Sequence, residues 1–270
     1  MTKILAKSKA EYLKNKLFKI GYSEFKQNNQ YVVWSLKKDK NTVTYYTSGK
    51  LYITKGEEEI LGILNEEYVS TIGADESGKG DYFGPLVVCA AYIPKKEYQK
   101  FYKLNIRDSK KINDRTISKI FEGENFKYEV KILKPKEYNT KIEEYRNLNI
   151  LLTETYKDVI TKLKNNTKCE KIVIDAYQAP EKIIKSFDYK VIAVTKAEEK
   201  ELSVALASII ARYFFLKEIE KMSIEYSLEF PKGSSNVIDF AKTFIERYGE
   251  EELFKVAKIH FSLTHKILRQ

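Results

Sequence analysis

Two adjacent carboxylates and a lysine stand among glycines in the stretch GADESGKGD, residues 73–81. The glycines and the lysine match the phosphate-binding pattern GxxxxGK[ST], except that Gly80 replaces the hydroxyl residue that should hold magnesium. Asp75 and Glu76 would also lie inside a cradle for polyphosphate, where their like charge repels the ligand. Both features argue against a nucleotide-binding loop. An enzyme of the P-loop nucleotide hydrolase type therefore remains only a rival interpretation of this stretch.

The same carboxylates suit a divalent cation. They follow Val69–Ala74, which is typical of a buried strand, and buried carboxylates are costly unless they bind something positive. Because adjacent residues on a regular strand face opposite ways, we expect the strand to end before Asp75 and Glu76, so that both serve one site. Carboxylate oxygens suit Mg²⁺ or Mn²⁺ better than zinc. Gly78 and Gly80 would let backbone groups approach a ligand closely.

Two more acids occur at the ends of later predicted elements. Asp175 closes the apolar run KIVID, and Glu198 follows the strand predicted over residues 189–195. Each acid alone could equally be a solvated strand end or helix start. Four such acids on one sheet favour a pair of metal ions, the usual equipment of phosphodiester hydrolysis. Spacing does not choose between Glu198 and Glu199.

The elements that must position these acids form an α/β pattern. Strands are expected over residues 69–74, 86–93, 126–133, 171–175 and 189–195, and helices over 147–163, 201–222, 237–248 and 250–259. This alternation indicates a mixed sheet flanked by helices. The helix over 201–222 alternates small and apolar residues, so it can pack tightly against the sheet.

The segment 1–65 has a different pattern. It predicts a helix, three strands over residues 31–36, 42–47 and 51–54, and a second helix over 56–64. We therefore expect a small α+β domain over 1–65, built as helix, antiparallel sheet and helix, before a larger domain over 66–270. Ser8 and Glu11 have the spacing of a capping box at the first helix.

The small domain also carries most of the net charge. Of the +10 total, the segment 1–55 contributes +9, from twelve lysines against three acids, whereas the segment 56–270 holds 36 basic and 35 acidic groups. This asymmetry favours a segment that binds nucleic acid over a general compositional bias. The predicted sheet carries five aromatic residues that could stack on bases or pack beneath the helices: Tyr31, Trp34, Tyr45, Tyr46 and Tyr52.

Composition excludes several classes of protein. With 43% hydrophobic and 32% charged residues, the chain can bury a core and is not of the disordered class. No apolar run is long enough to span a membrane. Two cysteines and two histidines show no zinc-ligand spacing, and so few cysteines suit a reducing compartment. We expect a cytoplasmic monomer with no obligate protein partner.

Four motifs in order resemble the type 2 ribonuclease H family. They are GADESGKGDYFGPLVV, Asp108-Ser109-Lys110-Lys111, IVIDAY and KAEEKELSVALASIIARY. Within that family the chain is most similar to ribonuclease HIII, because it has Gly78-Lys79-Gly80 and Lys196-Ala197-Glu198 where ribonuclease HII enzymes typically have Gly-Arg-Gly and an Asp. The segment 1–65 resembles the TATA-binding-protein-like substrate-binding domain of that group.

The resemblance implies a ribonuclease H-like sheet and an endonuclease that hydrolyses the RNA strand of RNA/DNA hybrids with two Mg²⁺ or Mn²⁺ ions. The products would carry 5′-phosphate and 3′-hydroxyl ends. It assigns metal binding and catalysis to four acids, which are Asp75, Glu76, Asp175 and Glu198. It assigns substrate contacts to the backbone of Gly78, Lys79 and Gly80, and further contacts to Ser109, Lys110 and Lys111. The alternatives are a ribonuclease HII-like enzyme that cuts at single ribonucleotides in duplex DNA, and a non-catalytic nucleic-acid-binding protein whose acids are structural.

Overall fold

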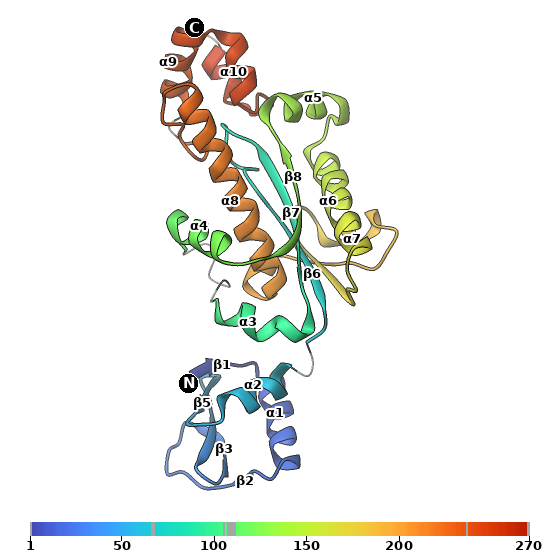
Figure 1. The fold of residues 1–270 in the computed structure, drawn as a ribbon, viewed down its shortest axis with the longest axis vertical. Helices are drawn as coiled ribbons and strands as arrows, with labels where there is room; N and C mark the ends of the chain where they lie inside the picture. The colour runs from blue at the N-terminus through green and yellow to red at the C-terminus, as the bar shows by residue number, and fades with distance from the viewer. Residues whose placement is uncertain (1, 66–67, 105, 107–111, 236, 269–270) are drawn as a thin grey trace. The chain divides into compact units, whose positions relative to one another are not determined.

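The structure is a computed structural model that describes residues 2–65, 68–104, 106, 112–235 and 237–268 (Figure 1). Contacts divide the chain into two compact units, Met1–Tyr68 and Val69–Gln270. Across the described ranges, every helix is too short or too polar to cross a membrane.

The first unit is a five-stranded antiparallel sheet packed against two helices. Its strands have the order β1-β5-β4-β3-β2. Their bounds are β1 (Thr2–Ile4), β2 (Ser23–Glu24), β3 (Val32–Lys38), β4 (Asn41–Tyr46) and β5 (Lys50–Ile53), and the helices are α1 (Lys7–Lys19) and α2 (Glu57–Asn65). The expected helix, antiparallel sheet and helix are confirmed. Strands β1 and β2 were not predicted, because such short segments cannot show alternation.

Helix α1 does not begin with a capping box. Its N-cap is Ala6, with no side-chain hydrogen bond, so Ser8 already lies inside the first turn. A serine there cannot accept from the amide three residues on in the way that a capping box requires. The capping-box prediction is therefore wrong.

The aromatic residues of this sheet divide between core and surface. Trp34 and Tyr45 are both 5% exposed and stack with their ring centroids 5.6 Å apart in the core beneath the helices. Tyr31 is 61% exposed and Tyr52 is 45% exposed, while Tyr46 is half-buried. Only the last three can meet a ligand.

The second unit is a mixed five-stranded sheet with the order β10-β9-β6-β7-β8. Strand β6 pairs antiparallel with β7 and parallel with β9; β7–β8 is antiparallel and β9–β10 is parallel. The bounds are β6 (Thr71–Ser77), β7 (Leu86–Ile93), β8 (Lys127–Leu133), β9 (Lys171–Asp175) and β10 (Ile192–Val194).

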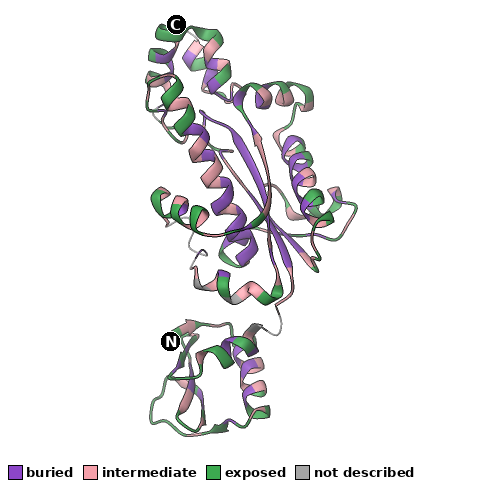
Figure 2. Cartoon of the chain, in the orientation of Figure 1, coloured by how far each residue is buried: buried purple, intermediate pink, exposed green. Residues whose placement is uncertain are grey.

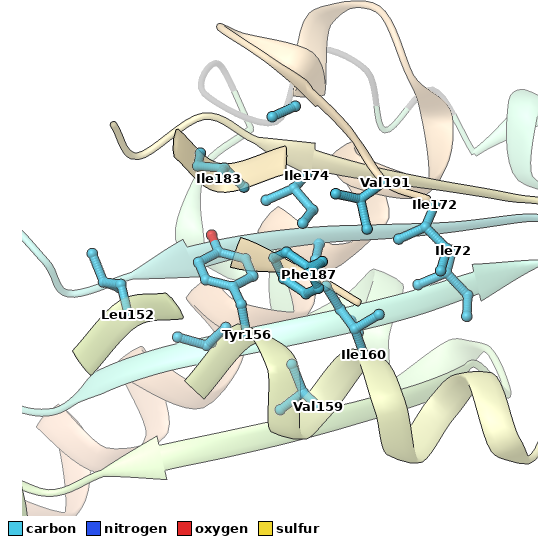
Figure 3. Close-up of a cluster of buried hydrophobic side chains, with 14 of the residues drawn as sticks. Ile72, Leu152, Tyr156, Val159, Ile160, Ile172, Ile174, Ile183, Phe187 and Val191 are labelled. Atoms are coloured by element: carbon cyan, nitrogen blue, oxygen red, sulfur yellow. The ribbon is translucent and has the colours of Figure 1, made fainter. Parts of the chain in front are cut away.

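Helices cover both faces of this sheet, which confirms the α/β expectation (Figure 1). Helix α8 (Leu202–Glu225) lies along one face against β6 and β7, and α4 (Asp114–Gly123) packs on α8. Helix α6 (Leu148–Asn165) packs on the other face. Figure 2 shows the central strands buried and the outer sides of the helices exposed. The core on the α6 side joins even-numbered β6 residues to α6 and includes Tyr156 (Figure 3).

Gly73 lets α8 approach β6 closely. A Cβ atom on Gly73 would lie 2.2 Å from the backbone of Ser203 and Val204. Only hydrogen fits there, so the small residues of both elements allow the tight packing that the sequence predicts.

Several short helices were not predicted, because a few turns show little periodicity. They are α3 (Tyr98–Lys103), α4, α5 (Pro135–Tyr145), α7 (Pro180–Ser186) and α11 (Thr264–Leu268), together with the 3₁₀ helices η1 (Lys95–Glu97) and η3 (Ala197–Glu199). Helix α9 (Ile238–Tyr248) lies as expected. Helix α10 (Glu250–Val256) ends earlier than expected, because Ala257 forms an antiparallel bridge with Phe83.

Candidate active site

Strand β6 carries the adjacent acids Asp75 and Glu76, and it does not end before them. The pairing with β7 continues through Asp75, Glu76 and Ser77. The pairing with β9 stops at Ala74, which lies opposite Ile174. The expected strand end is therefore wrong on the β7 side, but on the β9 side β6 has an open edge from Asp75 onward.

The two acids point to opposite faces of the sheet, as alternation requires. Asp75 accepts a hydrogen bond from Ser208 of α8 and another from the Glu76 backbone amide, at 2.8 Å. Glu76 accepts a hydrogen bond from the hydroxyl of Tyr156 on α6. The open edge toward β9 is where side chains from both faces can meet.

Asp175 is the last residue of β9, one step beyond the residue that pairs with Ala74. Its Oδ1 accepts a hydrogen bond of 2.7 Å from the backbone amide of Ala197, the first residue of η3. The next residue, Glu198, is 2% exposed, whereas Glu199 is exposed. This hydrogen bond links the end of β9 to the segment that carries Glu198, the fourth acid.

Like charges gather around Asp75. Burial raises the pKa of Asp75 well above its ordinary value, and the charges of Glu76 and Asp175 raise it further, against the hydrogen bonds from Ser208 and the Glu76 amide. The pKa of the Tyr156 hydroxyl is also raised, by burial and then by Glu76 and Asp75. Asp75 thus lies among negative charges in a partly buried place, and a divalent cation would neutralise them.

Within the described residues, no three Asp, Glu, His or Cys side chains form a group that could hold a metal ion as they stand. Glu76 and Asp175 lie within electrostatic reach of Asp75, and binding an ion would require the carboxylates to turn toward a common point.

The loop after β6 contains Gly78, Lys79 and Gly80 and leads into strand β7. A phosphate-binding loop leads into a helix instead, so the nucleotide-binding interpretation fails here. Gly78 has φ +86°, a left-handed conformation that favours glycine, and Gly80 is exposed. The Lys79 nitrogen lies 3.3 Å from Glu76 Oε1 and donates to the Tyr177 carbonyl, also at 3.3 Å. Ser109, Lys110 and Lys111 lie outside the described residues.

A cavity of about 380 Å³ lies beside these acids, between the end of β6, α4 and α8. Its lining includes Glu76, Ser208, Asp114 and Arg212. Asp114 Oδ1 lies 3.4 Å from Arg212 Nε, and Oδ2 lies 2.7 Å from the nitrogen of Lys232. Burial raises the pKa of Asp114, but the hydrogen bond from Lys232 and the charge of Arg212 outweigh it, so the pKa is lowered. Two cations share one carboxylate here.

Three residues of this site, Ser208, Asp114 and Tyr156, were missed by the sequence predictions, and Arg212 was left without a role. Arg212 is the first charged residue in the small and apolar pattern of α8, which was a usable signal, whereas Ser208 fits that pattern and gave none. Asp114 and Tyr156 gave no signal, because a helix N-terminal acid and a core tyrosine are ordinary residues at such places.

Comparison with known proteins gives consistent matches. The family model described as "Ribonuclease HII" matches residues 72–264. The ribonuclease HIII of Aquifex aeolicus is 35% identical over 244 residues, which cover 87% of this chain and 90% of the relative. The crystal structure of Bst-RNase HIII in complex with Mn²⁺ superposes with a TM-score of 0.72 at 28% identity, over 99% of this chain and 97% of that one.

A shorter relative matches only part of this chain. The crystal structure of ribonuclease H2 from Pyrococcus horikoshii gives a TM-score of 0.63 at 28% identity. The match covers 97% of that chain but 74% of this one.

Proposed function

Since this chain belongs to the type 2 ribonuclease H family and is an endonuclease for the RNA strand of RNA/DNA hybrids, we propose that four acids perform the hydrolysis with Mg²⁺ or Mn²⁺. These acids are Asp75, Glu76, Asp175 and Glu198. The observation that carries the proposal is the pairing of β6 with β9. This pairing ends at Ala74 and Ile174, so the next residue on each of the two strands is an acid, Asp75 on β6 and Asp175 on β9. Burial raises the pKa of Asp75, the charges of Glu76 and Asp175 raise it further, and this crowding of negative charge supports a cation between them.

Three of the four acids have a neighbour that orients them. Ser208 and the Glu76 amide hold Asp75, Tyr156 holds Glu76, and the Ala197 amide holds Asp175. When bound, two divalent ions would acidify the attacking water and stabilise the leaving 3′-oxygen. The products would then carry 5′-phosphate and 3′-hydroxyl ends.

We propose that the loop after β6 reads the RNA strand. The backbone of Gly78, Lys79 and Gly80 is assigned to the 2′-hydroxyl groups, which distinguish RNA from DNA. The exposure of Gly80 and the contact of Lys79 with Glu76 support this role beside the acids. Contacts of Ser109 and Lys110 with the substrate backbone belong to the same proposal, on the strength of the motif alone.

We propose that the first unit, over 1–65, binds the sugar-phosphate backbone of the hybrid. Its sheet carries a cavity of about 440 Å³ whose lining includes Tyr31, Tyr46, Lys50 and Tyr52. Aromatic rings beside a lysine suit stacking and phosphate contact. The match to a ribonuclease H2 that covers only 74% of this chain supports a separate role for this unit.

We further propose a cytoplasmic monomer that needs no other protein. Two free thiols, the buried Cys89 and the half-buried Cys169, suit a reducing compartment.

The substrate distinguishes a ribonuclease HIII-like from a ribonuclease HII-like enzyme. The test compares cleavage of a continuous RNA/DNA hybrid with cleavage of a DNA duplex that contains one ribonucleotide, first in Mg²⁺ and then in Mn²⁺. We expect rapid cleavage of the continuous hybrid and little of the other duplex. Preferential cleavage at the single ribonucleotide would instead assign HII-like specificity.

A further inference from the structure

Lys258 is fully buried just beyond α10. Lysine is among the residues least often buried completely, because its ammonium loses its hydrogen bonds to water and needs other acceptors in their place. Here backbone carbonyls are those acceptors. The Lys258 nitrogen donates to the carbonyls of Gly84 at 2.5 Å, Pro85 at 3.4 Å and Phe83 at 3.5 Å. Three consecutive carbonyls of the loop between β6 and β7 therefore turn toward one ammonium group.

The backbone of the same segment also holds this loop. The Lys258 amide donates to the Tyr82 carbonyl at 2.8 Å, and the Gly84 amide donates to the Val256 carbonyl at 2.9 Å. Ala257 and Phe83 form an antiparallel bridge between these two bonds. The chain after α10 thus fixes residues 82–85, which lie outside the sheet ladder.

The Pro85 carbonyl connects Lys258 to Gly78. A Cβ atom on Gly78 would lie 2.1 Å from that oxygen, so the two backbones are in direct contact. The Asp81 amide donates to the Gly78 carbonyl at 3.2 Å and closes the turn over Lys79 and Gly80. A shift of the Pro85 carbonyl would therefore move the backbone of residues 78–80.

The ammonium of Lys258 has no access to a substrate. The residue is 0% exposed, and its nitrogen lies 5.9 Å from the centroid of the Tyr138 ring on α5. Burial lowers the pKa of Lys258 to about 7, and the charge of Asp81 acts in the opposite direction. Any effect of this residue on a substrate must pass through the loop that it holds.

We infer that Lys258 is a positioning residue for the RNA strand, because it draws the carbonyls of residues 83–85 together and thereby sets the backbone of Gly78, Lys79 and Gly80. This inference rests on the proposed function, which assigns that backbone to the 2′-hydroxyl groups. It predicts that Lys258 governs hybrid binding more than the chemical step, since its ammonium binds the loop carbonyls and not the four acids.

The test measures kcat and KM on a continuous RNA/DNA hybrid for full-length Lys258→Met, which keeps the length of the side chain but removes its donors. We expect KM to rise about tenfold and kcat to stay within about twofold. The reason is that a displaced backbone at residues 78–80 loses contacts that bind the hybrid, whereas the four acids that perform the hydrolysis keep their places. Lys258→Gln keeps two N–H donors and should give an intermediate KM.

Phe244→Leu is the matched control, since Phe244 is buried in α9 and its ring packs on Tyr226 and Phe230. Rates are compared well below the unfolding temperature of each variant, and the control should keep the wild-type KM. An unchanged KM in both Lys258 variants, an equal rise in the control, or failure of both Lys258 variants to fold would overturn the inference. Absence of hybrid cleavage by the wild-type chain would instead overturn the proposed function.

Discussion

At the scale of single residues, Glu198 and Glu199 are neighbours in the chain with opposite surroundings. Glu198 is 2% exposed beside the Ala197 amide that binds Asp175, and Glu199 is exposed. A buried carboxylate needs a positive partner, whereas an exposed one is solvated. The structure therefore offers a matched pair of substitutions for the fourth acid.

Glu198→Gln should lower kcat for hybrid cleavage by more than about 100-fold, because even loss of a group that only orients a metal ligand typically costs roughly 10- to 100-fold. Glu199→Gln should stay within about twofold of the wild type. Initial rates at saturating hybrid check both, with thermal unfolding as the control for folding. Equal losses in the two variants would refute the assignment of Glu198.

The sequence alone points to the candidate acids, but it does not point to the residues that hold them in place. Asp75, Glu76 and Asp175 are acids at the ends of apolar runs, which is a rare and visible pattern. Tyr156 lies among the apolar residues of α6, where a tyrosine predicts only core packing. Its hydroxyl meets Glu76 because of how α6 crosses the sheet, and that crossing is set by tertiary packing.

At the scale of elements, the end of β6 differed from expectation for a physical reason. Alternation predicts which face a residue occupies, but not whether a strand loses its partners on both sides at once. Strand β6 keeps β7 through Ser77 and loses β9 after Ala74. One open edge is enough to let acids from both faces approach one place.

The contact between β6 and α8 gives a prediction at the same scale. Gly73→Ala should destabilise the second unit by about 3 kcal/mol, because its Cβ would lie 2.2 Å from the Ser203 and Val204 backbone. Gly123→Ala is the control, since its Cβ position meets no described atom within 4 Å beyond its chain neighbours and its own helix backbone, and it should change stability by less than about 0.5 kcal/mol.

Urea unfolding followed by far-ultraviolet circular dichroism measures both variants. The only tryptophan of the chain, Trp34, reports separately on the first unit through its fluorescence and should be unaffected. Equal midpoints for Gly73→Ala and Gly123→Ala would contradict the close packing of α8 on β6.

At the scale of the whole molecule, charge and chemistry are divided between the two units. The segment 1–55 carries a net charge of +9, and the four proposed catalytic acids lie in the other part of the chain. Composition alone revealed the division of charge, because that depends on counts of charged residues along the chain, whereas the proposed acids were located by their motifs. Which aromatic residues face solvent could not be foreseen, since Tyr31 and Tyr45 have the same chemistry and differ only in packing.

Deleting residues 1–65 should weaken hybrid binding more than about tenfold at about 0.1 M salt. It should also flatten the dependence of log K on log salt, because each lost phosphate contact removes about 0.9 from the slope. Binding titrations of full-length and truncated protein at several salt concentrations measure both effects. A truncated protein that binds the hybrid as tightly as the full chain would refute the role of the basic unit.

The most direct test of the central claim is cleavage of a continuous RNA/DNA hybrid labelled on each strand, by the wild type and by Asp75→Asn. With Mg²⁺ or Mn²⁺ the wild type should cut only the RNA strand, leave 5′-phosphate ends and stop when EDTA is added. Asp75→Asn should bind the hybrid and leave it intact. Cleavage that persists in EDTA, or in the folded Asp75→Asn variant, would contradict the account.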